Sequence, residues 1–387
     1  MSSPMAGLRV VDLSQIYNGP YATYLMALAG ADVIKIEPPG GEPLRRRGEV
    51  GGAALPFAML NGSKRSVVLD LKSDSGVDAL KALAADADVF VENFAPGVTD
   101  RLGIGADTLM AANPRLIYAS SSGYGRDGPY RAYPAMDLTI QAIGGVMHTT
   151  GFPDRPPVKA GPAMADFFAG IHLYSAIATA LYDRERTGTA RRVEVAMQDA
   201  VYASLSSSLG MSWASTEQTV PPRTGNRHGG LAESPYNVYP TADGYIAIIC
   251  VGEAHWRALA REMDRPELAD DPDFGTLAAR VANMDRIDDI VGAWTATLST
   301  DLAFERLMGA KVPCAPVRTL EEVMNDANMH ARGALTWIDH PQLGRIVVQR
   351  SPLRFDDVDL ITPKPSRTLG ADTDAVLADV SGWPPCR

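Results

Sequence analysis

The sequence is poor in the residues that bind metals or form disulfides. Only three cysteines occur among 387 residues, Cys250, Cys314 and Cys386, and no two of them form a CxxC pair. The six histidines show neither HxH nor HxxxH spacing. We therefore predict no disulfide framework and no metal site, and the low cysteine content favours a reducing compartment, the cytoplasm.

Motifs for nucleotide binding and serine catalysis are also missing. The chain has neither a GxxxxGK[ST] P-loop nor a GxSxG nucleophile elbow, and residues 103–105 (GIG) lack the third glycine of a dinucleotide-binding fingerprint. Basic residues do not predominate. The formal net charge is −10 at pH 7, which argues against a protein that binds nucleic acid or an anionic membrane.

Long hydrophobic runs are absent as well. The first residues lack the basic and apolar regions of a signal peptide. The longest apolar stretch, near residues 167–182, is interrupted by His172 and Ser175 and is judged too short to span a bilayer. We therefore expect a cytoplasmic protein with no membrane partner.

Short apolar runs alternate with helical patterns in the first half of the chain. Near-continuous apolar strands separated by helices are typical of a mostly parallel sheet with helices on both faces. Ligands of such sheets bind at the carboxyl ends of the strands, which favours the loops after Leu13, Leu71, Phe94 and Ser122. The predicted strands cover residues 8–13, 33–36, 66–71, 89–94, 116–120 and 192–197, and the predicted helices cover 20–28, 74–85 and 166–182.

The pattern changes after residues 219–230, a segment rich in Pro, Gly and Arg. Two apolar runs, 236–239 and 245–251, flank Thr-Ala-Asp-Gly, which predicts a β-hairpin. Helical patterns follow near 254–263 and 285–299. The chain is long enough for two domains, and this region is typical of a second, α+β domain.

Four ordered segments carry a resemblance to a known family. They are residues 11–14 with 18–20 and 30–38; 61–66 with 69–72; 91–97 with 101–103; and 122–125 with 128–129. Later pieces match at 225–226, 235–236, 243–244 and 312–317. In this order and spacing they resemble the class III CoA-transferase family, which also includes the α-methylacyl-CoA racemases.

The resemblance covers nearly the whole chain and implies its fold and partners. It implies a large Rossmann-like domain of residues 1–218 and 331–387 and a small α+β domain of residues 219–330. It also implies an interlocked homodimer. The substrates would be an acyl-CoA thioester and a small carboxylic acid, with no permanently bound cofactor, no metal and no nucleic acid.

Asp166 ends the segment 158–166 (VKAGPAMAD) and occupies the position of the family's catalytic aspartate. A carboxylate can attack a thioester carbonyl and form a mixed anhydride, which divides one difficult step into two. On the residues alone, a first-turn or N-cap aspartate before a long helix is the commoner role. Burial would raise its pKa and weaken the nucleophile, whereas a helix N-terminus would offset part of that rise.

The resemblance also implies a CoA site in the loops that follow strands. Lys72 and Arg101 can neutralise phosphates, Asn93 can form hydrogen bonds, and Phe94 can pack near adenine or pantetheine. Taken singly, each cation would be interpreted as a solvated surface charge. Arg46, or its neighbours Arg45 and Arg47, would replace an arginine that some members carry where this chain has Pro38. The other implied contacts are Gln15, Ile16, Leu69 and Tyr124.

Met136 separates the two chemistries of the family. The racemases carry His-Asp where this chain has Met136-Asp137, and they use that histidine as one of two opposed bases. Methionine cannot take a proton, so two-base racemisation is disfavoured. Asp137 either lines the thioester site or starts a helix at the surface. Gly229 and Gly230 either belong to the family's glycine-rich lid, here shorter than in formyl-CoA transferases, or to an interdomain linker.

We therefore predict an acyl-CoA:carboxylate CoA-transferase that works through an aspartyl mixed anhydride and an aspartyl-CoA thioester at Asp166. The alternatives are a 2-methylacyl-CoA racemase and a non-catalytic CoA-binding protein. The first would exchange the Cα proton of its substrate, and the second would have no use for Asp166.

Overall fold

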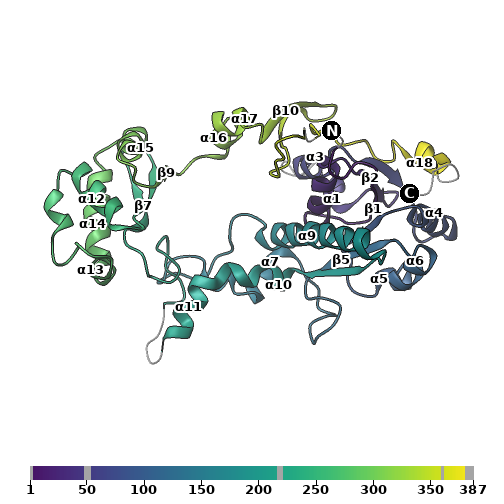
Figure 1. The fold of residues 1–387 in the computed structure, drawn as a ribbon, viewed down its shortest axis with the longest axis horizontal. Helices are drawn as coiled ribbons and strands as arrows, with labels where there is room; N and C mark the ends of the chain where they lie inside the picture. Colours follow the sequence, from purple (N-terminus) through teal and green to yellow (C-terminus); the bar gives the residue numbers. More distant parts are fainter. Residues whose placement is uncertain (1–2, 48–53, 216–220, 359–360, 380–387) are drawn as a thin grey trace. The chain divides into compact units, whose positions relative to one another are not determined.

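The computed structural model describes residues 3–47, 54–215, 221–358 and 361–379, which form two compact units (Figure 1). Unit 1 comprises Met1–Ile143, Pro162–Val201 and Met324–Arg387, and unit 2 comprises Gly144–Gly161 and Tyr202–Val323. The boundary that the sequence suggested at 218/219 lies outside the described residues, as does Cys386. Residues 144–161 and 202–215, assigned from the sequence to the large domain, group with unit 2 because they make most of their contacts there.

A six-stranded parallel sheet forms the centre of unit 1. Its strands are β1 (Arg9–Asp12), β2 (Asp32–Glu37), β3 (Arg65–Val68), β4 (Val89–Glu92), β5 (Ile117–Ser122) and β6 (Arg192–Ala196). Their order is β3-β2-β1-β4-β5-β6, and every neighbouring pair is parallel. The predicted α/β fold with a Rossmann-like sheet is confirmed. The strand order reverses between β1 and β4, and such a switch point opens a crevice for ligands.

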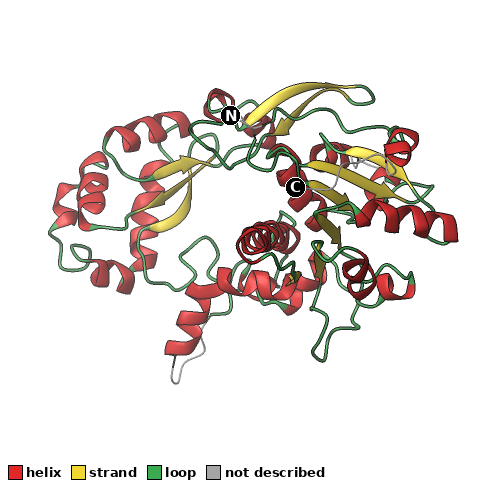
Figure 2. Ribbon diagram, turned by 45° about the vertical axis from the view of Figure 1, so that its right-hand side comes forward, coloured by secondary structure: helices red, strands yellow, loops and turns green. Residues whose placement is uncertain are grey.

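Helices cover both faces of this sheet (Figure 2). Because successive side chains of a strand point to opposite faces, Val10 packs toward α1 (Asn18–Leu28) and α9 (Met164–Thr187), whereas Val11 packs toward α4 (Asp74–Ala85) and α6 (Ala106–Ala112). The other described elements of unit 1 include α2 (Pro43–Arg46), α3 (Ala54–Asn61), α5 (Val98–Arg101), α7 (Asp137–Ile143), α10 (Met197–Tyr202), α17 (Ala327–Ala331), α18 (Thr373–Asp379) and the hairpin of β10 (Leu335–His340) and β11 (Gly344–Gln349).

Helix α9 is longer than the sequence suggested. It has 24 residues and ends at Gly188, whose φ of 72° stops the helix in a left-handed conformation. Our prediction that this stretch is too short to span a bilayer is wrong. By length and composition alone, α9 is long and apolar enough to do so. Its stripe of Ala169, Leu173 and Ile177 is fully buried against the sheet and α1, so the helix belongs to the protein core.

Unit 2 combines a small antiparallel sheet with helices. Strands β7 (Tyr236–Pro240) and β8 (Tyr245–Ile249) form the predicted hairpin, and β9 (Cys314–Pro316) pairs with β8. Their buried face packs against Trp256, Val291 and Leu307 of the surrounding helices. Those helices include α12 (Glu253–Glu262), α13 (Leu277–Ala282), α14 (Met284–Thr295) and α15 (Thr300–Gly309), and the unit also holds α8 (Val146–Thr149) and α11 (Ser206–Ala214). The predicted α+β character of the smaller part is confirmed.

Candidate active site

A pocket of about 310 Å³ opens in unit 1 at the carboxyl ends of β1, β4, β5 and β6. This is the edge where parallel α/β sheets bind ligands. Seven residues proposed from the sequence line it: Gln15, Ile16, Asn93, Phe94, Tyr124, Met136 and Asp166. Tyr124 packs edge-on against Tyr130 and Tyr133, with ring centroids 5.8 and 6.0 Å away, and so forms part of an aromatic wall.

Asp166 lies in the first turn of α9, and its side chain is buried at 8% exposure. Burial, reinforced by the nearby negative charge of Asp137, raises the pKa of the Asp166 carboxyl to about 7. At neutral pH this carboxyl is therefore about half ionised. In the protein the carboxylate and its protonated form therefore coexist.

Asp137, at the start of α7, is the side chain that caps α9. Its Oδ1 accepts hydrogen bonds from the backbone N–H of Ala165 at 2.9 Å and of Asp166 at 3.4 Å, while the N-cap residue Ala163 supplies no side-chain acceptor. Gln141 Nε2 donates to the other oxygen, Oδ2, at 2.7 Å. The N–H groups of this helix N-terminus thus bind Asp137 rather than the Asp166 carboxylate. The pKa of Asp166 is raised, as expected from burial, and these N–H groups are not free to offset part of the rise.

The loop after β1 is held by side chains from two other segments. Asn93 Oδ1 accepts from the backbone N–H of Gln15, and Asn93 Nδ2 donates to the Gln15 carbonyl, both at 2.8 Å. Glu42 Oε2 accepts from the N–H of Ile16 at 3.1 Å. Ile16 has a φ of 67°, a left-handed conformation that a β-branched residue rarely adopts. Asn93 therefore shapes the pocket by fixing this loop.

Four further residues proposed from the sequence lie outside the pocket lining. Lys72 is exposed beyond β3, two strands away from β1, and Arg101 is exposed at the end of α5. The side chain of Leu69 is buried in the core at 6% exposure, so only its backbone is available to a ligand. Arg46 is exposed on α2.

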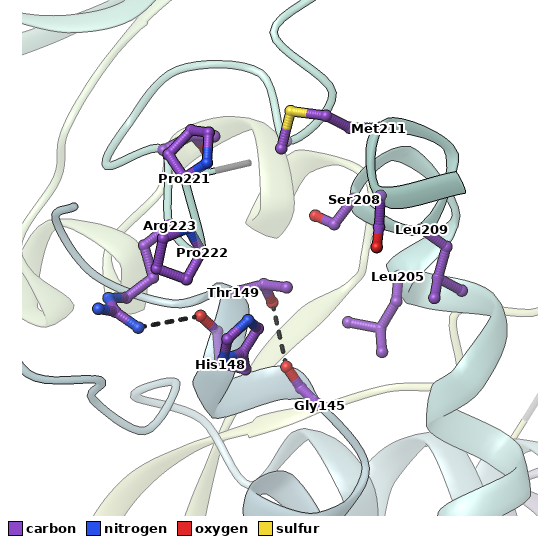
Figure 3. Close-up of a pocket in the computed structure, with 13 residues that line it drawn as sticks. Gly145, His148, Thr149, Leu205, Ser208, Leu209, Met211, Pro221, Pro222 and Arg223 are labelled. Atoms are coloured by element: carbon purple, nitrogen blue, oxygen red, sulfur yellow. Dashed lines mark hydrogen bonds between the residues drawn. The ribbon is translucent and has the colours of Figure 1, made fainter. Parts of the chain in front are cut away.

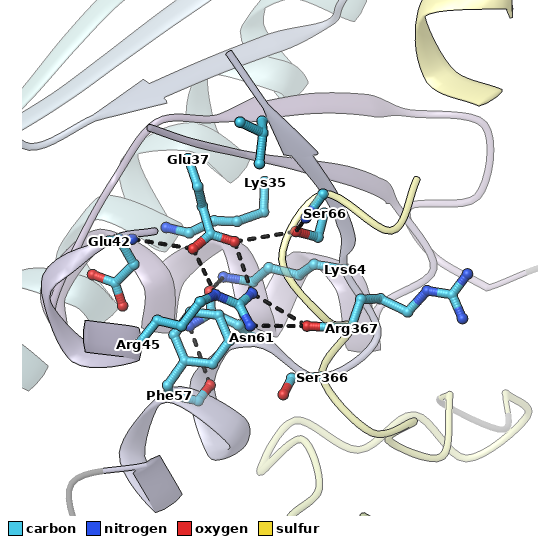
Figure 4. A network of polar contacts seen from close by, with 12 residues as sticks. Lys35, Glu37, Glu42, Arg45, Phe57, Asn61, Lys64, Ser66, Ser366 and Arg367 are labelled. Atoms are coloured by element: carbon cyan, nitrogen blue, oxygen red, sulfur yellow. Dashed lines mark hydrogen bonds and ion pairs between the residues drawn. The ribbon is translucent and has the colours of Figure 1, made fainter. Parts of the chain in front are cut away.

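The Arg45 guanidinium already has partners within the protein. We therefore no longer propose Arg45 as the replacement for the CoA-binding arginine that this chain lacks at Pro38. Figure 4 shows its guanidinium between Glu37 and the carbonyl of Arg367. Its Nε and Nη2 donate to the two Glu37 carboxylate oxygens at 2.9 and 2.8 Å, and its guanidinium lies 4.0 Å from the centre of the Phe57 ring. Arg46 and Arg47 have exposed side chains and remain candidates.

Gly229 and Gly230 lie in unit 2, whereas Asp166 lies in unit 1. Gly229 lines a pocket of about 250 Å³, which Figure 3 shows between His148, Leu205 and Pro222. Arg223 donates to the His148 carbonyl at 3.3 Å at the edge of this pocket. The backbone N–H of Gly230 donates to His228 Nδ1 at 3.2 Å.

Several lining residues were missed from the sequence. Asn18 stands in the quoted segment 18–20 but was not selected. Arg131 and Tyr133 lie in the loop after β5, and Met197 is the first residue of α10, directly after β6. Arg131 could have been found from the sequence, because it is a cation seven residues after Tyr124 in a loop that follows a predicted strand. No group of three or more His, Cys, Asp or Glu side chains in the described ranges could hold a metal ion.

A buried aspartate at a helix start lines a pocket at the switch point of a parallel sheet, which is where α/β proteins bind their ligands. The model of CoA-transferase family III matches residues 5–373, and the chain belongs to this family. The resemblance and the prediction of a CoA-transferase are confirmed.

Curated relatives are similar over most of their length. The formyl-CoA:oxalate CoA-transferase of Streptomyces avermitilis is 37% identical, over 92% of this chain and 90% of the relative. The succinyl-CoA:mesaconate CoA-transferase of Haloarcula hispanica is 37% identical over 97% and 96%. Acetyl-CoA:oxalate CoA-transferase of Acetobacter aceti is 38% identical over 92% and 90%.

Solved structures show the same fold. A CAIB/BAIF family protein from Brucella suis matches with a TM-score of 0.86 and 35% identity, over 98% of this chain and 100% of that one. A hypothetical protein from Mycobacterium tuberculosis matches with a TM-score of 0.84 and 29% identity, over 97% and 99%.

Proposed function

We propose that this CoA-transferase moves CoA from an acyl-CoA to a carboxylic acid, with Asp166 as the covalent carrier. The observation that carries the proposal is the buried Asp166 carboxyl in a pocket built by the loops after β1, β4 and β5. Named relatives act on formyl-, acetyl- and succinyl-CoA with oxalate or mesaconate, so the substrates are an acyl-CoA thioester and a small carboxylic acid.

The first half-reaction loads the CoA onto Asp166. The carboxylate attacks the thioester carbonyl, the C–S bond breaks, and an acyl-aspartyl anhydride and CoA thiolate form. The thiolate attacks the Asp166 carbonyl of the anhydride. The donor acid leaves as a carboxylate, and a β-aspartyl-CoA thioester remains.

The second half-reaction runs in the opposite sense. The acceptor carboxylate attacks the aspartyl thioester and gives a new mixed anhydride and CoA thiolate. The thiolate then attacks the acyl carbonyl of that anhydride, which forms the new acyl-CoA and restores the Asp166 carboxylate. Arg131 lines the same pocket and supplies positive charge for an incoming carboxylate, which the charge of Asp137 would otherwise repel.

The remaining residues bind the coenzyme. Phe94, Gln15, Ile16 and Tyr124 contact the pantetheine end, because they line the pocket with Asp166. CoA is a long molecule, so Lys72, Arg101 and Arg46 are proposed for its phosphates outside the pocket, with Leu69 contributing its backbone. Gly229 and Gly230 are kept as proposed lid residues, and backbone N–H groups near the lid are proposed to stabilise the oxyanion. No permanently bound cofactor takes part, and we propose a cytoplasmic enzyme.

Met136 supports transfer over racemisation. It lines the pocket with Asp166, at the place where a racemase needs a second base, and a thioether cannot take a proton. We expect little deuterium uptake when the enzyme and a 2-methylacyl-CoA stand in deuterated water without an acceptor acid. Rapid deuterium uptake in this experiment would refute the transferase proposal in favour of a racemase.

Trapping of the intermediate tests the mechanism. We expect hydroxylamine, added during turnover with formyl-, acetyl- or succinyl-CoA, to convert Asp166 to a hydroxamate that mass spectrometry locates in its peptide. The peptide containing Asp137 is the internal control and stays unmodified, as does Asp166 without an acyl-CoA. An unmodified Asp166 with a donor that turns over would refute the mechanism.

A further inference from the structure

Asn18 presents an unpaired hydrogen-bond acceptor in the pocket that contains Asp166. It is the first residue of α1, it lines the pocket, and it is 2% exposed. Its side-chain oxygen, Oδ1, is buried and has no hydrogen-bond partner among the described residues. A buried acceptor left without a donor is costly, so this atom is suited to a group that the ligand brings.

The hydrogen bonds of Ser121 determine the orientation of the Asn18 amide, and therefore which of its two polar atoms is unpaired. The Ser121 hydroxyl donates its only hydrogen to the carbonyl of Val195 at 3.0 Å. It can therefore only accept from Asn18, whose Nδ2 lies 2.8 Å away. This chain of two hydrogen bonds fixes the amide so that nitrogen faces Ser121 and Oδ1 remains available.

Two neighbouring polar side chains already have partners. The amide of Asn93 is paired with the backbone of Gln15, and Ser122 Oγ accepts from the N–H of Gly125 at 3.0 Å. Among the described residues, Asn18 Oδ1 is the only buried, unpaired side-chain atom that belongs to this pocket. The unpaired acceptor is thus a local feature of one wall.

That wall adjoins the start of α9. Gly170 lies one turn after Asp166, and a Cβ on Gly170 would come within 2.7 Å of the Asn18 backbone carbonyl. The missing side chain of Gly170 therefore lets Asn18 pack directly on α9 beside Asp166. Because Asn18 is almost fully buried whereas Met136 is 60% exposed, Asn18 lies at the deep end of the pocket.

We propose that Asn18 Oδ1 accepts a hydrogen bond from a hydroxyl group of the acyl chain, so that the enzyme prefers hydroxy acids. This inference rests on the proposed function. A thioester has no hydrogen-bond donor of its own, and a second carboxylate offers only acceptors, which an amide oxygen repels. The acyl chain reaches the deep end, while the pantetheine arm enters from the exposed side.

The test compares acids that differ only by a hydroxyl group. With acetyl-CoA as donor, kcat/KM is measured for lactate against propionate and for 3-hydroxybutyrate against butyrate. Wild type is expected to prefer the hydroxy acid of at least one pair by roughly 5- to 150-fold, because the acid without a hydroxyl leaves Oδ1 unpaired. Asn18→Ala and the isosteric Asn18→Leu are expected to bring the ratio close to one.

Asn113→Ala is the matched control. Asn113 bonds the carbonyls of Ala84 and Ala87 outside the pocket, so its loss should leave the preference intact. Equal use of both acids of each pair by wild type overturns the inference and leaves the transferase function standing. An equal drop for both acids in Asn18→Ala assigns Oδ1 to the CoA arm and also overturns it. Absence of transfer to any acid refutes the proposed function itself.

Discussion

The pKa of Asp166 is set by its burial and by the neighbouring Asp137. Burial excludes the water that would solvate its charge, and Asp137 adds a negative charge beside it. Asp137 also occupies the N–H groups of the first turn of α9, which would otherwise favour the Asp166 carboxylate. The Asp166 carboxylate is therefore weakly stabilised as an anion, which is compatible with its proposed role as a group that forms and breaks an acyl bond.

This pKa predicts how activity depends on pH. Because only the carboxylate attacks, kcat/KM should fall about tenfold per pH unit well below pH 7 and level off above it. The measurement is kcat/KM for the acyl-CoA between pH 5 and 9, which reports the free enzyme. An acid limb centred near pH 4 would mean that Asp166 is an ordinary, solvated carboxyl.

The variant Asp166→Asn tests the same pKa independently, through the pH dependence of the free energy of unfolding. The folded-state pKa of Asp166 is raised to about 7, so the folded protein holds a proton that the unfolded chain releases near pH 4. Wild type therefore loses stability as pH rises from about 4 to 7, by at most about 4 kcal/mol. We expect Asp166→Asn to raise Tm at pH 8 and to change it little near pH 4. Equal Tm shifts at both pH values would contradict the raised pKa.

At the scale of elements, a buried ion pair holds the start of the β1 loop. Asp12, at the end of β1, is fully buried and pairs with Lys64 Nζ at 3.0 Å, and Thr23 of α1 donates to it at 2.7 Å. Lys64 also donates to the Pro20 carbonyl and to Asn61 of α3. Despite its burial, the pKa of Asp12 is held well below its usual range by nearby lysines and these hydrogen bonds. One lysine thus ties β1, α1 and α3 together.

Lys64→Met should be strongly destabilising. Removing one partner leaves the Asp12 charge buried without its cation, which typically costs about 3–5 kcal/mol. Chemical denaturation at pH 7 measures the loss, and Lys72→Met, which removes an exposed lysine, is the control and should change stability by less than about 0.5 kcal/mol. A similar small change for both variants would show that Asp12 and Lys64 are not paired.

At the scale of the whole molecule, helix α11 and the residues just before it expose large aromatic side chains. Helix α11 has no buried residue, and Trp213 on it is 89% exposed. Tyr202, just before it, is 65% exposed. A helix of nine residues is marginal in water by itself, and exposed aromatic side chains of this size are typical of an interaction surface, so we propose that another chain covers them.

We therefore keep the prediction of an interlocked homodimer. Sedimentation equilibrium should give twice the chain mass of 41.3 kDa. Because interlocked chains cannot separate without unfolding, the dimer should persist on dilution to nanomolar concentration. A mass that falls to that of one chain on dilution would exclude interlocking, and a monomer at micromolar concentration would exclude the dimer.

Local pattern was enough to predict much of the fold. Each strand of the parallel sheet was predicted because buried parallel strands are continuous apolar runs, and α4 was predicted with its observed bounds, Asp74–Ala85. The C-terminal end of α9 was not, because its last turn before Gly188 consists of polar residues that break the apolar pattern. The grouping of residues 144–161 with unit 2 was also missed, since it depends on contacts with residues far along the chain.

The sequence alone was sufficient for the order of the strands and helices, for the family and for Asp166 as the candidate nucleophile, because these follow from local periodicity and from ordered motifs. The tertiary structure alone decided the chemistry around that residue. The pKa of Asp166 depends on Asp137, which lies 29 residues away, and the orientation of the Asn18 amide depends on Ser121, which lies 103 residues away. Electrostatic fields and hydrogen bonds act through space, so folding had to bring these groups together before either property existed.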